Sequence, residues 1–213
     1  VGHRFGPLSQ EQLDNLLELD RELGRLMEAL DAEVGEGSWV LALSADHGVL
    51  DLPEARMEAG LPAGRLGAAE LAAADAALAG VGVGDDGVAV AEALRAGGIV
   101  ADAYPFAELR APGEVRDSFM PLYRNGWVED RVLSFPGLAV EVRLPEGTYG
   151  EEFGTGHGSP YHYDRWVPFI VYGAGIDAAR HSDPVSTTDF APTLAVRLGL
   201  TPPTDLDGRD VLR

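Results

Sequence analysis

The sequence predicts an α/β fold with a mainly parallel sheet flanked by helices, and three observations lead to this prediction. Residues 39–43 read WVLAL, a continuous apolar run that is typical of a strand buried on both faces of a parallel sheet. An amphipathic helical pattern comes directly before this run. A second apolar run, residues 166–173, is followed by another helical pattern, so helices and strands alternate along the chain.

Composition and charge exclude some partners. The chain has 213 residues, of which 46% are hydrophobic, and its formal net charge is -19 because 35 acidic residues outnumber 16 basic ones. Such a charge argues against binding to a nucleic-acid polymer or to an anionic membrane surface. A small phosphorylated substrate remains possible, since a bound metal ion can reverse the local potential. No apolar run reaches the ~20 residues of a membrane span, and no cysteine can form a disulfide.

The first helix is expected to begin after Ser9, which has the spacing of a capping box with Gln12. An apolar stripe then recurs at helical spacing and is expected to lie in the core, formed by Leu13, Leu16, Leu17, Leu23, Leu26, Met27 and Leu30. Gly35 is suited to a left-handed cap at the end of this helix.

The middle of the chain differs in composition and is rich in alanine and glycine. Propensity and alternation predict helices over 68–78 and 88–96 and strands over 99–104 and 138–144, with 131–135 as the hairpin partner of the last. We expect residues 51–150 to be an α+β insertion or cap, and residues 1–50 and 151–213 to form the α/β core. A final helix is expected near Thr188, with N-cap candidates at its start and Gly199 at its end.

The candidate chemistry lies at three glycine-punctuated loops. Asp46 and His47 directly follow the first apolar run, at the strand end where open α/β sheets carry their sites. His3 and His157 each stand among glycines, at VGHRFGP and GTGHGSP. Aspartate and histidine together suit Zn²⁺ and similar divalent ions. By itself His3 fits a solvated loop residue equally well, whereas His157 lies before a buried strand with no apolar face around it.

Five motifs in this order resemble the alkaline phosphatase superfamily, and most closely its branch of phosphate-irrepressible, PafA-type alkaline phosphatases. They are VGHRFGP at 1–7, SADHG at 44–48, GHGSPYHYD at 156–164, TDFAPT at 188–193 and DGR at 207–209. The likeness runs from Val1 to about Arg209 and is looser between 61 and 152. It implies an alkaline phosphatase-like fold.

The resemblance also implies a two-zinc site. In that family His3 and His157 would serve one ion, and Asp46 and His47 the other. Two metal ions ~3.5–4 Å apart can hold the attacking and leaving oxygens of a phosphoryl transfer. The expected reaction is hydrolysis of phosphate monoesters, with a phosphodiesterase or nucleotide pyrophosphatase of the same superfamily as the alternative. A periplasmic or secreted location is implied by the family alone.

The chain departs from the family pattern in one respect. The family places another ligand, an aspartate, two residues before the valine of Val-Gly-His, and its threonine or serine nucleophile further upstream. We therefore expect this chain to match the C-terminal portion of such an enzyme and assign no catalytic residue within it.

Two further alternatives remain open from the sequence. The chain could be a metal-binding or structural module without activity, because two ligands per ion are fewer than zinc usually takes from protein. A Ser-His-Asp hydrolase of Ser159, His157 and Asp164 is disfavoured, because residues two apart are poorly placed to act as nucleophile and base and no Gly-x-Ser-x-Gly motif occurs.

Overall fold

The computed structural model describes residues 1–82, 84, 86–111, 113–128 and 138–212. Contacts divide the chain into two compact units, one of residues 1–13 and 47–165 and the other of residues 14–46 and 166–213. The segments around His3 and His157 thus pack in one unit with residues 51–150. The division into a core and an insertion at residues 50 and 151 stays a prediction.

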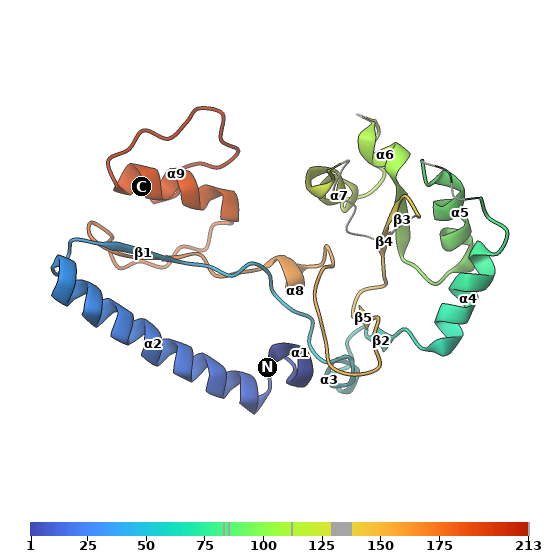
Figure 1. The fold of residues 1–213 in the computed structure, drawn as a ribbon, viewed down its shortest axis with the longest axis horizontal. Coiled ribbons are helices and arrows are strands. Elements are labelled where there is room, and N and C mark those ends of the chain that lie inside the picture. Colours follow the sequence, from blue (N-terminus) through green and yellow to red (C-terminus); the bar gives the residue numbers. More distant parts are fainter. Residues whose placement is uncertain (83, 85, 112, 129–137, 213) are drawn as a thin grey trace. The chain divides into compact units, whose positions relative to one another are not determined.

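The first unit carries short helices and short paired strands (Figure 1). Its helices are α1 (Gly2–Phe5), α3 (Pro53–Glu58), α4 (Ala68–Leu78), α5 (Val88–Gly97), α6 (Phe106–Arg110), α7 (Met120–Gly126) and α8 (His162–Arg165). Its strands are β2 (Gly64–Arg65), β3 (Asp102–Pro105), β4 (Val140–Arg143) and β5 (Thr148–Tyr149). The predicted helices 68–78 and 88–96 are confirmed as α4 and α5.

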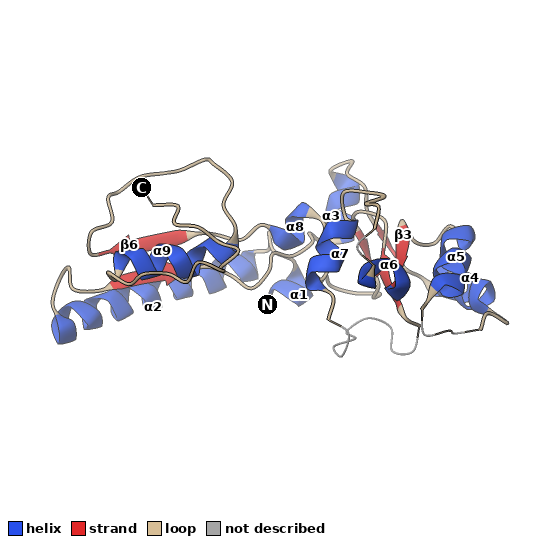
Figure 2. Cartoon of the chain, turned by 90° about the horizontal axis from the view of Figure 1, so that it is seen from above, coloured by secondary structure: helices blue, strands red, loops and turns tan. Residues whose placement is uncertain are grey.

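The core of this unit forms around the antiparallel pair β3–β4, in which Asp102 lies opposite Arg143 and Pro105 opposite Val140. Helix α5 and the strands bury one apolar cluster, made of Val90, Ala91, Leu94, Ala103 and Val140. A second cluster joins β3 to α6 and α7, whose ribbons lie beside the strands in Figure 2, and consists of Tyr104, Phe106, Leu109 and Met120. The strands predicted at 99–104 and 138–144 therefore pair with each other, while the hairpin partner predicted at 131–135 lies outside the described residues.

Two arginines form ion pairs with acidic side chains of this core. Arg116 binds Asp102 at 2.5 Å and Glu108 at 2.7 Å, and Arg95 binds Asp102 at 2.9 Å. Burial raises the pKa of Asp102, but hydrogen bonds from Arg116, the Ala103 amide and Arg95 outweigh it and hold that pKa below its usual value. The cluster fixes α5, β3 and α6 relative to one another.

The second unit contains most of α2 (Gln10–Val34), then β1 (Val40–Leu43), β6 (Ile170–Gly173), the 3₁₀ turn η1 (Thr187–Asp189) and α9 (Phe190–Arg197). The predicted cap is present, because the Gln12 amide donates to Ser9 Oγ at 3.1 Å. Gly35 has a φ of 95°, as expected for the residue that ends α2. No helix within the described ranges is long and apolar enough to cross a membrane.

The expected predominance of parallel pairing is wrong for the strand pairs of the described residues. β1 and β6 run antiparallel, with Val40 opposite Gly173 and Leu43 opposite Ile170, and only β2–β5 is parallel. The chain leaves β1 into the loop of Asp46 and returns to the same sheet through β6, so the two strands run in opposite directions. β1 is also only half-buried along its length, not buried on both faces.

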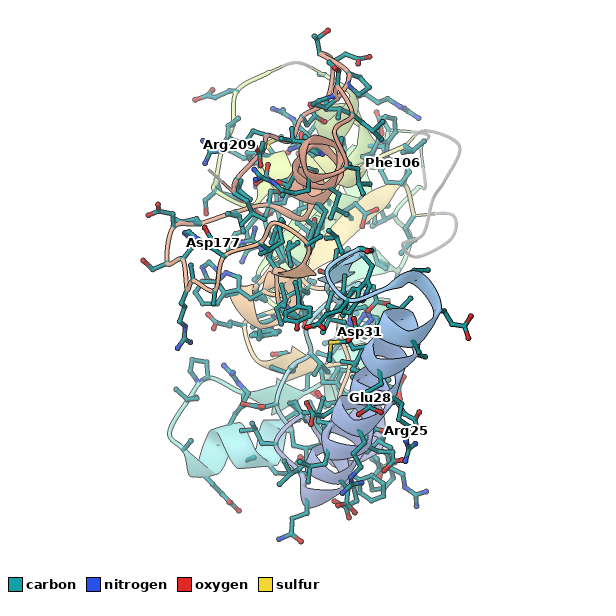
Figure 3. The ribbon with its side chains drawn as sticks, turned by 90° about the vertical axis from the view of Figure 1, so that its left-hand side faces the viewer. Arg25, Glu28, Asp31, Phe106, Asp177 and Arg209 are labelled. Atoms are coloured by element: carbon teal, nitrogen blue, oxygen red, sulfur yellow. The ribbon has the colours of Figure 1, made fainter. Side chains whose placement is uncertain are left out.

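The apolar stripe of α2 was expected in the core, and this expectation is wrong for the described structure. No residue of α2 is buried, and leucines at 13, 16, 17, 19 and 26 are 45–56% exposed. Arg25, Glu28 and Asp31 line the same helix in Figure 3. The amphipathic pattern is real, but its apolar side is covered only in part, where Leu23, Met27 and Leu30 are half-buried.

The TDFAPT motif at 188–193 and the DGR motif at 207–209 hold the C-terminal segment together. Ser186, not Thr187 or Thr188, caps the final helical segment, and its amide donates to Asp189 at 2.8 Å. The other oxygen of Asp189 accepts the Arg209 amide at 2.8 Å, which ties the closing loop to the start of α9. A side chain at Gly208 would collide with the Thr188 carbonyl, so the glycine of the DGR motif is required for this approach.

Candidate metal centre

Three loops of the first unit meet around the candidate ligands. They are residues 1–6, which contain α1 and His3; residues 47–50, which contain His47; and residues 154–159, which contain His157. The loops are far apart in the sequence, so contacts between them depend on the tertiary fold.

The first and third loops are joined by two hydrogen bonds between His3 and Thr155. The Thr155 amide donates to the His3 carbonyl at 2.7 Å, and Nδ1 of the His3 ring donates to the Thr155 carbonyl at 2.9 Å. Gly154 lies so close to the His3 carbonyl that any side chain there would collide with it. This close approach explains the glycine before Thr155 in the GTGHG motif.

The second and third loops are joined at Leu50. The Leu50 amide donates to the Gly156 carbonyl at 3.1 Å, and Thr155 Oγ1 donates to the Leu50 carbonyl at 2.7 Å. Thr155 is 1% exposed and Leu50 is 3% exposed, so these bonds are shielded from water. A Cβ at Gly156 would lie 2.6 Å from the Tyr149 ring, so this glycine is also needed for packing.

The contacts bring the three predicted histidines together. The ring centroids of His47 and His157 are 3.3 Å apart and nearly parallel, and those of His3 and His157 are 5.2 Å apart. The three rings therefore lie side by side in the first unit. His162 and His181 are exposed.

The hydrogen bonds of the rings fit metal binding. Nδ1 of His3 faces the Thr155 carbonyl, and Nδ1 of His47 faces the Gly48 carbonyl at 2.7 Å. A carbonyl only accepts, so each facing Nδ1 carries the proton and Nε2 keeps its lone pair when the ring is neutral. An N–H···O=C bond opposite the ligating nitrogen is the usual support of a zinc-bound histidine.

Asp46 is exposed and directly precedes His47. It is the last residue of a segment of the second unit, so its participation stays a prediction. Within the described ranges no group of three or more histidine, cysteine or acidic side chains is arranged to hold one ion.

A cavity of about 210 Å³ adjoins the third loop, lined among others by His157, Arg143 and the tyrosines at 149, 161 and 163. A larger cavity of about 330 Å³ lies between β2, α4 and the end of α5, and none of the predicted ligands lines it. The first cavity is therefore the one next to the candidate centre.

Several residues that build this centre were missed from the sequence. Thr155 and Leu50 join the loops through the bonds described above. The carboxylate of Asp164 accepts hydrogen bonds from the Ser159 amide at 2.7 Å and from the Ser159 hydroxyl at 2.6 Å. In the Ser-His-Asp alternative the aspartate would orient the histidine, whereas here it binds the serine directly. The Ser159 hydroxyl is thus used in holding the loop.

Comparisons with known proteins find similar sequences and similar solved structures. The family model described as type I phosphodiesterase / nucleotide pyrophosphatase matches residues 1–84. The chain is 27% identical to alkaline phosphatase PafA of Elizabethkingia meningoseptica over 99% of its length, and 30% identical to alkaline phosphatase PhoK of a Sphingomonas species over 98%. The crystal structure of wild-type PafA superimposes with a TM-score of 0.76 at 22% identity, covering 99% of this chain.

The chain spans less than half the length of these relatives, 43% of PafA and 44% of PhoK. The shared α/β fold confirms the predicted fold class, and the relatives confirm the resemblance drawn from the five motifs. In the order of its motifs, the family model that matches residues 1–84 and the alkaline phosphatase relatives, this chain resembles the alkaline phosphatase superfamily.

Proposed function

We propose that this chain is part of a metal-dependent phosphatase that hydrolyses phosphate monoesters. In this proposal His3 and His157 hold one zinc ion, and Asp46 and His47 hold a second. Zinc supplies a Lewis acid that polarises a phosphoryl oxygen. The nucleophile, a threonine or serine, comes from a part of the complete enzyme outside these 213 residues.

The observation that carries the proposal is the meeting of His3, His47 and His157 in the first unit. Their rings lie within 5.2 Å of His157, although the residues are up to 154 positions apart in the sequence. The carbonyls of Thr155 and Gly48 accept from Nδ1 of two of these rings, an arrangement that orients Nε2 as the ligating nitrogen. The chain's own contribution is therefore to orient ligands in advance of binding.

The rest of the site acts on the rings through the backbone. Thr155, 1% exposed, bonds to both His3 and Leu50, so the first and second loops move with the third. Glycines at 154 and 156 allow this approach, because any side chain at either position would collide with its neighbours. A larger residue at these positions would separate the loops and misplace the ligands.

A phosphodiesterase or nucleotide pyrophosphatase is the second candidate. The family model that matches residues 1–84 carries that description, while the matched relatives are described as alkaline phosphatases. The superfamily relation supports both reactions, and the relatives favour the monoesterase. Small phosphorylated substrates are common to the two.

The deciding experiment uses the complete enzyme that contains this chain and compares the hydrolysis of aryl phosphate monoesters and diesters. We expect the monoester to be the better substrate, and a diester hydrolysed as fast or faster would favour the second candidate. His157→Ala and Asp46→Ala should each remove most of the activity and reduce bound zinc. His181→Ala, a change at an exposed histidine outside the site, is the matched control.

The inactive-module alternative is tested with the 213-residue chain by itself. We expect weak zinc binding and no turnover, because each ion has two ligands from this chain and zinc takes three or four from protein. Tightly bound stoichiometric zinc together with turnover would contradict the division of the site proposed above. An extracytoplasmic location, implied by the family, is part of the proposal and is tested by fractionating cells that express the complete protein.

A further inference from the structure

Asp164 stands out among the buried polar residues near the candidate centre. It lies in α8, seven residues after His157, and is 5% exposed. Burying a carboxylate costs free energy unless it is hydrogen-bonded, so a buried aspartate at this place requires an explanation. The function proposed above assigns it no task.

The carboxylate of Asp164 holds the loop of His157. Its Oδ2 accepts both the amide of Ser159 at 2.7 Å and the hydroxyl of Ser159 at 2.6 Å. Two such charge-assisted bonds to a single residue fix both the backbone and the side chain of that residue. Ser159 is two residues from His157, so the position of the ligand depends on this contact.

The backbone of the same residue holds the other ligand loop. The Asp164 carbonyl accepts the amide of Gly48 at 2.7 Å, and Gly48 directly follows His47. The carbonyl of Gly48 in turn accepts from the His47 ring. One residue therefore binds, through different atoms, the loops that present His47 and His157.

The remaining oxygen of Asp164, Oδ1, is buried and has no hydrogen-bond partner among the residues that the structure describes. A carboxylate kept in such a place must gain enough from its other contacts to offset this loss. An apolar residue would fill this place without an unsatisfied oxygen, so the presence of an aspartate indicates a specific role and not packing alone.

We propose that Asp164 is a positioning residue that couples the two loops carrying His47 and His157 and so sets the spacing of the candidate ligands. The inference rests on the proposed function for its purpose, but the coupling itself is a property of the metal-free chain. A purely local role would be limited to Ser159. If the loops are coupled, loss of the carboxylate also changes the amide exchange of Gly48, although the carboxylate does not contact Gly48.

The test uses the isotopically labelled 213-residue chain without metal, with zinc removed by a chelator. Amide hydrogen exchange at Ser159 and Gly48 and the cross-relaxation between the His47 and His157 rings are measured by NMR in four variants. In Asp164→Ala we expect both amides to exchange at least tenfold faster and the ring cross-relaxation to disappear. Asp164→Asn should restore most of both, because its amide oxygen can accept the two Ser159 bonds.

Asp189→Ala is the matched control, since Asp189 is also 5% exposed and holds a serine and a distant amide, but lies in the second unit. It should leave Gly48, Ser159 and the ring contact unchanged. Ser159→Ala removes one of the two bonds to Asp164, together with the bond from the Tyr161 amide to the hydroxyl, and is the milder variant should Asp164→Ala fail to fold. It should accelerate exchange at Gly48 by a smaller factor. Unchanged Gly48 exchange and ring contact in either folded variant would overturn the proposal.

Zinc titration of the same variants separates this inference from the proposed function. We expect Asp164→Ala to weaken zinc binding by roughly 10–100-fold, as for other residues that support metal ligands. A parent chain that binds no zinc would count against the proposed metal site, while the exchange and cross-relaxation results would still decide the role of Asp164.

Discussion

Arg65 shows how a single residue can fix a loop that carries a candidate ligand. Its guanidinium binds both oxygens of Glu54, at 2.6 and 2.7 Å, and donates to the carbonyls of Glu151 and Gly154 at 2.9 and 3.0 Å. The hydrogen bonds from Arg65 lower the pKa of Glu54 to about 2. Arg65 therefore connects α3 to the segment that leads to His157.

We predict that Glu54→Gln lowers the free energy of unfolding by about 0.2–1 kcal/mol at pH 7, the range of a partly exposed ion pair. A carboxyl with a depressed pKa stabilises the fold above its unfolded pKa of about 4.5 and loses that effect as the pH falls toward 2. The difference between the parent and variant should thus vanish between pH 4.5 and 2 in urea unfolding. Glu18→Gln, in the exposed pair with Arg21, is the control and should change less.

A difference that persists at pH 2 would show that Glu54 acts through packing and not through its charge.

At the scale of single residues, the sequence marked the candidate ligands but not the residues that hold their loops in place. His3, His47 and His157 were found because glycine-rich surroundings and strand ends mark them locally. Thr155, Asp164 and Arg65 were not assigned, because their bonds join residues up to 152 positions apart and leave no local pattern. Only the GTGHG motif, in which Thr155 stands between two glycines that close packing requires, offered a signal.

At the scale of elements, an amphipathic sequence pattern does not ensure that a helix is buried in this chain. α2 and α5 both have an apolar side, yet α5 buries Val90, Ala91 and Leu94, whereas no residue of α2 is buried. A helix gains most of its stability in a protein from packing of its apolar face. α5 should therefore be held more firmly than α2.

We predict that Leu94→Ala lowers the free energy of unfolding of the first unit by about 2–5 kcal/mol, because it removes a side chain that is 5% exposed from a packed cluster. Leu26→Ala in α2, where the leucine is 45% exposed, is the matched substitution and should cost less than about 1 kcal/mol. Urea unfolding followed by NMR would report both. Equal costs would mean that α2 is packed as firmly as α5.

Strand direction was the element property that the sequence did not provide. An apolar run such as 39–43 predicts a strand, but the residues of a run are compatible with either pairing direction. The antiparallel pair β1–β6 is set by the path of the chain between residues 43 and 170, which no local pattern records. Helix boundaries at 68–78 and 88–97, which depend on local propensity and glycine, were predicted well.

At the scale of the whole molecule, charge is the dominant feature. A formal net charge of -19 makes the acidic side chains repel one another in the compact state. Ion pairs offset part of this repulsion locally, but pairs such as Arg21–Glu18 are more than half exposed and contribute little. The network around Asp102, whose side chain is 12% exposed, is better shielded from solvent and salt.

We predict that this charge makes the chain more stable in moderate salt than in low salt. Raising NaCl from about 0.01 to 0.15 M shortens the Debye length from ~30 to ~8 Å, which screens the long-range repulsion more than the short-range ion pairs. If screening adds about 1 kcal/mol, the melting temperature should rise by ~2–4 °C for a chain of this size. The measurement is thermal unfolding at pH 7 with a chelator present, so that metal binding makes no contribution.

KCl should give the same rise as NaCl, because screening depends on ionic strength and not on the identity of the cation. A melting temperature that falls with salt would show that attractive ion pairs, and not the excess of acidic groups, dominate the electrostatics of this fold.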